Sequence, residues 1–295
     1  RNNTMSALDG NRATHPPSIL APLPEDRDAW NQLQVKLADV NKQIESRKAA
    51  ATNDFQAWLA GQSKTESKEI DSTLSLHLPL ISPNGKITGI IDGAAKEWPA
   101  EPARIDGPKG KAVVITDKPI ELGDIGNFTR SDQVSYGGFV WFEGAPTGSV
   151  IAKIDPSQGY RGWDLWLEDG KPGAHVIDSW DKSACKMQSD EKLKPKKWYH
   201  MMVVFDGTRS GHECLSLYID GKKTAAKIYP NTVGGNIVTS TPLTLGSRAN
   251  GESKITNKVA LQDFRLYRRL LSPSEIARLA NTQRIDEWLA IPADK

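Results

Sequence analysis

The stretch 196–221 constrains the fold of this chain more than any other part of the sequence. It contains two runs rich in β-branched, aromatic and Met residues, and each run ends in an Asp-Gly pair, which is a strong turn signal. In the second run Leu215, Leu217 and Ile219 alternate with more polar positions. This pattern predicts an antiparallel strand pair with one face buried and the other in water.

Short runs of the same kind, separated by Gly, Pro and Asp, occur on both sides of this pair. Their length and spacing are typical of an all-β sandwich. We expect one β domain over residues 74–271, preceded by a polar linker at 62–73. Besides the pair, the expected strands lie at 74–80, 87–91, 112–116, 134–142, 149–154, 163–167, 175–180, around 228, at 243–246 and at 259–267.

The flanking segments show different patterns. Residues 1–24 are Pro-rich without an apolar period, which predicts an extended leader. Within 25–61, apolar residues recur at steps of three and four from Trp30 to Trp58, which predicts one long helix. Ser272 and Pro273 form a helix start signal, so we expect a helical tail over 272–295, including a second amphipathic piece at 285–291.

The apolar stripe of the long helix leaves two alternatives open. Arg47 and Asp54 interrupt the stripe, and a helix of this length is not expected to stand alone in water. Either it is an arm that packs on another part of the chain or of a larger parent protein, or it associates with itself as a coiled coil.

Charge and hydropathy exclude several classes of partner. The 38 Lys and Arg residues balance 36 Asp and Glu residues and are interspersed with them, so there is no basic stripe for a nucleic acid. No apolar run approaches the ~20 residues of a membrane span. The chain begins at Arg1 without a signal segment, so we expect a mature product or an excised piece.

Two cysteines, Cys185 and Cys214, fit no metal-binding or redox spacing. We expect both to be free thiols. A disulfide between neighbouring strands is the alternative.

Several fragments in chain order resemble a laminin-G-like (pentraxin-type, concanavalin A-like) domain. They include W-Y-H, V-V-F-D-G-T and L-Y-I-D-G-K in the central strand pair, L-H-L-P-L at 76–80, G-K-A-V at 110–113, S-Y-G-G-F-V at 135–140, L-T-L-G-S-R at 243–248 and L-Q-D-F-R-L-Y at 261–267. The resemblance implies a mainly β protein, a two-sheet antiparallel β-sandwich (jelly roll), here with a long N-terminal helix and a short C-terminal helix. The chain ends commonly lie close together in this fold, so we expect the long helix and the tail to meet.

The flanks carry a second resemblance. Residues 5–11, followed by Pro-rich sequence and the long helix, are similar to the region preceding such domains in large secreted planctomycete-type proteins with a c-type cytochrome domain. This resemblance implies an internal segment of a multidomain protein, with the haem outside it and neighbouring domains contacted through the helix. It also implies an exported setting, periplasmic or at the cell surface.

A catalytic function is not expected. Laminarinase-type glycosidases, which share the resembled fold, use alternating carboxylates in the pattern E-x-D-x-E, and this alternation does not occur here. A glycoside hydrolase or lyase is therefore the third interpretation. His200 has no Ser, Cys or paired carboxylate beside it, so we expect a packed strand histidine with a hydrogen-bond partner.

Sugar recognition is the favoured function, through the concave sheet or its rim loops. With a loop at 169–173, strand 163–167 pairs with 175–180 so that Leu165 lies opposite Ile177 on the buried face. A slip of one residue would invert this assignment.

In this register the outer face carries aromatic rings beside carboxylates, which suits pyranose recognition. The candidate ligand-binding residues are Trp166, Trp180, Asp164, Asp178 and, on the same face by alternation, Trp141. The alternatives are that one or more of these rings is buried, and that the domain is a structural spacer of a multidomain protein without a ligand.

Calcium is a candidate cofactor through the resemblance alone. Related domains often hold Ca²⁺ near the last strand, and Asp263 stands at the matching place. The loop at 82–85 lacks the Asp that the family often supplies, and Ca²⁺ requires about six to eight oxygen ligands.

Overall fold

The computed structural model describes residues 22–62, 73–81, 85–116, 118–210, 214–229 and 233–281, which fall into two units divided after Lys68. The predicted leader apart from 22–24, most of the linker, the loop at 82–84 and the helical piece at 285–291 lie outside the described residues. Among the helices that are described, none combines the length and apolarity of a membrane span.

The N-terminal unit contains the predicted long helix. A 3₁₀ turn, η1 (Pro24–Asp26), leads into α2 (Arg27–Gln62). The apolar stripe is exposed within this unit, since Trp30 and Leu37 keep 47% and 55% of their surface in water. Both alternatives for its partner therefore remain predictions, as does the expected meeting of helix and tail.

We expect the chain to be monomeric in solution, because Arg47 and Asp54 interrupt the stripe that a coiled coil would bury. Light scattering over a concentration series measures the molar mass. A mass that rises with concentration would contradict the arm interpretation. It would establish a coiled coil if Leu37→Glu abolished the rise and Val35→Glu, off the stripe, did not.

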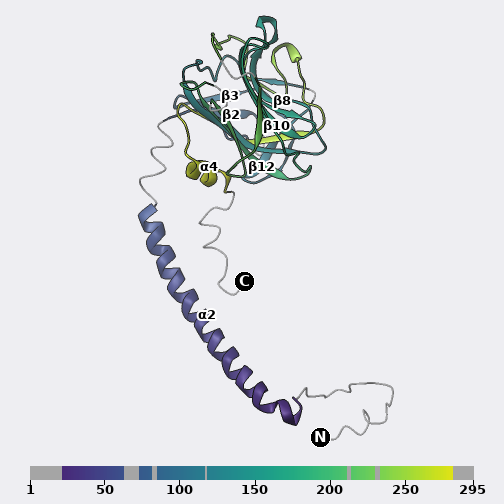
Figure 1. The fold of residues 1–295 in the computed structure, drawn as a ribbon. Coiled ribbons are helices and arrows are strands. Elements are labelled where there is room, and N and C mark those ends of the chain that lie inside the picture. Colours follow the sequence, from purple (N-terminus) through teal and green to yellow (C-terminus); the bar gives the residue numbers. More distant parts are fainter. Residues whose placement is uncertain are drawn as a thin grey trace, which may run out of the picture. The chain divides into compact units, whose positions relative to one another are not determined.

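The second unit is a sandwich of two antiparallel sheets, as predicted (Figure 1). The ten-stranded sheet has the path β14-β13-β12-β7-β17-β1-β2-β3, with β5 also paired to β17 and β4 to β5. Its strands are β1 (Leu74–Leu78), β2 (Ile87–Ile91), β3 (Ala94–Trp98), β4 (Arg104–Gly107), β5 (Gly110–Ile115), β7 (Gln133–Phe142), β12 (Trp198–Asp206), β13 (Leu215–Ile219), β14 (Lys222–Lys223) and β17 (Val259–Tyr267).

The seven-stranded sheet has the order β15-β11-β10-β9-β8-β16-β6. Its strands are β6 (Ile120–Glu121), β8 (Gly148–Asp155), β9 (Arg161–Glu168), β10 (Lys171–Ser179), β11 (Ser183–Ser189), β15 (Ala226–Tyr229) and β16 (Thr244–Leu245). Two 3₁₀ turns, η2 (Pro156–Gln158) and η4 (Ala249–Gly251), lie in its connections, and the helix α4 (Pro273–Ala280) follows β17.

The core lies between the sheets. In the β12–β13 pair, Val203 lies opposite Leu217, as the alternation predicts. These side chains join Leu165 and Val176 of the other sheet in one buried cluster. Burial of this aliphatic surface is the main force that holds the two layers together.

The cysteines also join the layers. Cys185 in β11 and Cys214 just before β13 form a disulfide, and both side chains are buried. The expectation of free thiols is therefore wrong. The bond crosses from one sheet to the other instead of linking neighbouring strands, so strand spacing along the sequence did not reveal it.

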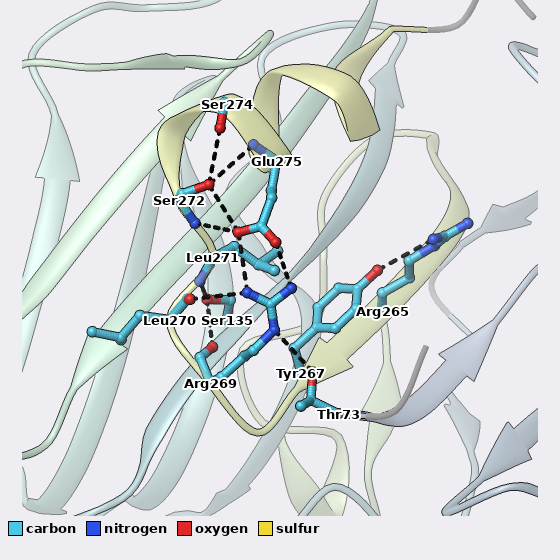
Figure 2. A network of polar contacts seen from close by, with 10 residues as sticks. All are labelled: Thr73, Ser135, Arg265, Tyr267, Arg269, Leu270, Leu271, Ser272, Ser274 and Glu275. Atoms are coloured by element: carbon cyan, nitrogen blue, oxygen red, sulfur yellow. Dashed lines mark hydrogen bonds and ion pairs between the residues drawn. The ribbon is translucent and has the colours of Figure 1, made fainter. Parts of the chain in front are cut away.

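A polar network fastens α4 to the end of β17 (Figure 2). Ser272 and Glu275 form a capping box at the start of the helix. Arg269 donates to both carboxylate oxygens of Glu275, at 2.6 and 3.0 Å, and to Thr73 Oγ1 at 3.1 Å. The first described residue of the domain is thereby tied to its last elements.

The pH dependence of stability tests this network. Hydrogen bonds from Arg269 lower the pKa of Glu275 from 4.5 to about 2. A carboxyl group whose folded pKa is depressed stabilises the fold above its unfolded pKa, and that contribution is lost as the pH falls through the folded pKa. We therefore expect Glu275→Gln to lower the free energy of unfolding at pH 7, and the difference from wild type to narrow as the pH falls from about 4.5 to about 2.

Urea unfolding across this pH range measures the difference. The control is Glu97→Gln, which breaks an exposed ion pair with Lys86 and should change stability little. A difference for Glu275→Gln that stays constant with pH would contradict the role assigned to its charge.

Candidate functional site

The candidate site lies on the outer face of the β9–β10 hairpin. A two-residue turn joins the strands, since Glu168 pairs with Lys171 and both Asp169 and Gly170 have positive φ angles. This turn is shorter than the expected loop at 169–173, so the predicted register is wrong. Leu165 lies opposite Ala174 instead of Ile177.

The correction changes which side chains share the outer face. Asp164 and Trp166 still point outward, because their neighbours Trp163 and Leu165 belong to the core. Asp164, however, lies opposite His175 and not beside Asp178. A histidine therefore stands where the sequence predicted a second carboxylate.

Asp164 is the centre of a buried ionic network. Its oxygens accept hydrogen bonds from Arg248 Nη2 at 2.9 Å, Arg248 Nε at 3.1 Å and Ser149 Oγ at 3.0 Å, and His175 Nδ1 lies 2.7 Å away. Burial alone would raise the pKa of Asp164, but the charges of His175 and Arg248 outweigh it and lower the pKa to about 2. Asp164 is 0% exposed, so the prediction that it contacts a ligand is wrong. It positions its neighbours instead.

Arg248 connects this network to the aromatic rings. Its guanidinium carbon lies 4.8 Å from the ring centre of Trp166, 5.3 Å from that of Trp180 and 5.4 Å from that of Tyr160. These distances are typical of cation–π contacts. Arg248 is only 4% exposed, so it lies beneath the rings and stabilises their positions.

These rings border a groove of about 280 Å³, here called the Trp166 groove. Its wall includes both indoles predicted as ligand platforms, and the residues lining it are Trp166, Glu168, His175, Trp180, Lys186, Met187, Gln188 and Tyr229. Tyr229 keeps 47% of its surface in water. A partly buried indole from β9 and a half-exposed phenol ring from β15 thus face a space of small-ligand size.

Lys186 supplies the positive charge in the groove. Its ammonium lies 4.1 Å from the ring centre of Trp180 and donates to the carbonyl oxygen of that residue at 3.1 Å. Burial lowers its pKa and the charge of Asp181 opposes this shift, although no carboxylate of the described residues lies within ion-pair distance of the ammonium. The carboxylate in the groove wall, Glu168, instead accepts from Gln188 Nε2 at 2.5 Å.

Two other predicted residues lie outside the groove. Asp178 is 3.5 Å from Arg161 Nη2, and its carboxylate packs against Gly235. Trp141 belongs to β7 of the ten-stranded sheet, so the expectation that it extends the same face is wrong. Alternation along a strand predicts its two faces but does not reveal which sheet the strand joins.

Asp263 does not fit a calcium ligand. One carboxylate oxygen lies 2.7 Å from His77 Nε2 and 2.9 Å from Arg265 Nε, and the other lies 2.5 Å from Lys109 Nζ. Burial opposes ionisation, but these partners hold the pKa of Asp263 well below its usual range. The neighbouring positive charges would repel a cation, and the described residues contain no cluster of three His, Cys, Asp or Glu side chains suited to a metal.

Sequence reasoning missed most of the other residues of the site, and four of them show why. His175 was placed out of position by the loop length. Lys186 lies on β11, which pairs with β10 of the hairpin, and Tyr229 lies on β15, which pairs with β11, and both pairings form only in the folded sheet. Arg248 is separated from Asp164 by 84 positions in the sequence. Of these four residues, only His175 had a signal in the sequence: the Asp-Gly pair predicts a two-residue turn, which would have given the correct register.

The fold and this face together define a lectin-like sandwich domain. A model of the concanavalin A-like lectin/glucanases superfamily matches residues 116–277, more than half of the chain. The chain therefore belongs to that superfamily. No curated protein matches it by sequence.

Solved structures agree with this fold. The binding domain of Paraclostridial Mosquitocidal Protein 1 superposes with a TM-score of 0.54 at 16% identity, over 72% of this chain and 53% of that one. The ligand binding domain of botulinum neurotoxin serotype D, in complex with N-acetylneuraminic acid, gives a TM-score of 0.53 at 14% identity, over 74% and 53%. This chain thus spans about half the length of these domains, and at such identities the likeness is one of fold.

Proposed function

We propose that this chain is a non-catalytic recognition module that binds a polysaccharide or glycoconjugate in the Trp166 groove. The observation that carries the proposal is the pair of indoles held in place by the buried Arg248–Asp164 ion pair. Rigid aromatic rings suit the C–H face of a pyranose, and preorganised contacts lose little entropy on binding.

The polar groups around the rings suit sugar substituents. Gln188 and Glu168 offer an amide and a carboxylate to hydroxyl groups, and Lys186 offers an ammonium without an ion-pair partner among the described residues. This ammonium favours a saccharide that carries a carboxylate or a sulfate. The structurally similar botulinum serotype D domain, which was solved with N-acetylneuraminic acid, supports this class of ligand.

The carboxylates in and near the wall of the Trp166 groove do not suit hydrolysis of the sugar. Glycosidases generally need two carboxyl groups that flank the scissile bond. Glu168 is the carboxylate lining the groove, whereas Asp164 is completely buried in its ion pair. A single accessible carboxylate supports binding without turnover.

We further propose an exported setting within a larger secreted protein, of the planctomycete type that the flanks resemble. The buried disulfide between Cys185 and Cys214 supports export, because such bonds persist mainly in oxidising compartments. The exposed stripe of α2 supports contact with a neighbouring domain. A spacer domain without any ligand is the alternative.

A glycan array followed by calorimetry tests the binding proposal. We expect an acidic saccharide to bind, and Trp166→Ala to weaken it about tenfold or more, which corresponds to about 1.4 kcal/mol per factor of ten. Trp141→Ala is the matched control, because Trp141 lies in the other sheet and should leave this affinity unchanged. If no glycan bound, the spacer function would be favoured instead.

A further inference from the structure

A second cavity lies on the outer face of the ten-stranded sheet. It has a volume of about 540 Å³ and is here called the Trp198 pocket, with Trp198, His200, Phe139, Asp106, Asp220 and Ala280 in its wall. The wall combines two neighbouring strands, the β4–β5 and β13–β14 turns, and the end of α4. None of these residues lines the Trp166 groove.

Close packing around the turns makes this pocket a preformed cavity. The β13–β14 turn lies directly against α4, since a Cβ added at Gly221 would be 2.8 Å from Ala277 Cα. The carboxylate of Asp220 accepts a hydrogen bond from the backbone N–H of His200 at 2.9 Å. The turn and the strand beneath it are therefore fixed relative to each other.

His200 is the feature that points to a ligand. Its side chain is 3% exposed and its ring lies 4.9 Å from that of Phe139, yet its Nδ1 has no hydrogen-bond partner among the described residues. The expectation of a satisfied strand histidine is therefore wrong for this atom. A buried unpaired polar atom is destabilising, and such atoms in native structures call for a water or ligand partner.

The ring of His200 is uncharged at neutral pH. Its pKa is lowered to about 4 mainly by burial, which the charge of Asp263 opposes and the charges of Lys109 and Arg265 reinforce. In the neutral form one ring nitrogen donates a hydrogen bond and the other accepts one. A partner with hydroxyl groups can satisfy either requirement.

The remaining wall is aromatic and electrically balanced. The indole of Trp198 is held by a hydrogen bond from its Nε1 to the carbonyl oxygen of Asp106 at 3.2 Å. Each carboxylate at the rim has a lysine partner: Asp106 lies 2.6 Å from Lys111, and Asp220 lies 3.6 Å from Lys197. A flat apolar ring beside two rim ion pairs, each without net charge, favours a neutral, polyhydroxylated ligand.

We propose that the Trp198 pocket is a second binding site, specific for an uncharged pyranose. The sugar ring stacks on Trp198, and its hydroxyl groups bond to the rim pairs and to His200. This site is independent of the Trp166 groove, which lies on the other sheet and carries the Lys186 ammonium, without an ion-pair partner in the described part of the chain and suited to acidic saccharides.

Saturation-transfer NMR on the full chain tests the proposal, with the methyl glycosides of glucose, galactose, mannose and N-acetylglucosamine as probes. We expect at least one of them to bind, and Trp198→Ala to weaken it about tenfold. Trp166→Ala is the control, because Trp166 lies in the other sheet and does not line the pocket, so this binding should be unchanged.

A second variant separates binding from folding. His200→Phe keeps an aromatic ring beside Phe139 and removes the unpaired nitrogen, so we expect an unchanged or higher melting temperature together with several-fold weaker binding. Absence of binding by every neutral glycoside would overturn the second site. Neutral binding that is lost in Trp166→Ala and kept in Trp198→Ala would also overturn it, while leaving the function of the groove intact.

Discussion

Replacing Arg248 with Met is expected to lower the free energy of unfolding of the sandwich domain by about 3–5 kcal/mol. Asp164 is 0% exposed, and the substitution would leave its charge with His175 as its remaining ionisable partner. An uncompensated buried charge is far more costly than the loss of an exposed ion pair. Urea unfolding followed by far-UV circular dichroism measures the change.

Arg161→Met is the matched control. Arg161 lies on the same strand as Asp164 but is partly exposed, and its guanidinium is 3.5 Å from Asp178. We expect this variant to lose less than about 1 kcal/mol. Equal losses in the two variants would contradict the central role of the Arg248–Asp164 pair.

The same pair predicts how stability depends on pH. The folded pKa of Asp164 is about 2, below the ordinary value of 3.8, so its ionised form stabilises the domain above about pH 3.8 and this contribution is lost as the pH falls through about 2. In the Arg248→Met variant the pKa of Asp164 should return most of the way to its ordinary value. The variant should therefore show a smaller loss of stability than wild type over this interval, and a parallel pH profile would argue against the assignment.

Removing the disulfide with Cys185→Ala and Cys214→Ala together is expected to cost about 2–5 kcal/mol. The bond ties the two sheets, so without it the unfolded chain gains conformational freedom that folding must remove. Thermal unfolding of wild type and variant measures the effect, and reduced wild type should behave like the variant. Because both sulfurs are buried, the reductant should act only after unfolding.

Alkylation under denaturing conditions provides the chemical check. Without reductant neither cysteine should react, and with reductant both should. Alkylation of both cysteines without reductant, together with an unchanged melting temperature in the double variant, would show that the thiols are free.

Short-range patterns in the sequence were sufficient to predict the elements that interactions between neighbouring residues determine. The alternation of Leu215, Leu217 and Ile219 identified the β12–β13 pair, because strand periodicity directly records which side chains face the core. Ser272, Pro273 and Glu275 identified the start of α4 for the same reason, since a capping box involves only neighbouring residues.

Sequence reasoning failed where strands with weak local signals are held by their neighbours. Residues 94–98 and 183–189 contain Ala, Lys, Ser and Gln and no run of β-branched residues, yet they form β3 and β11. Tertiary packing overrides propensity in such segments. The missed strand β11 carries Lys186 and Gln188, so the groove could not be assembled from the pattern alone.

The sequence by itself determined the two-layer class of the domain, the long helix, and the outward direction of Trp166 on its strand. The tertiary structure decided which carboxylate is buried, which cysteines meet, and which sheet carries Trp141. The physical reason is range: periodicity acts between residues a few positions apart, whereas ion pairs, disulfides and grooves join atoms that only folding brings together.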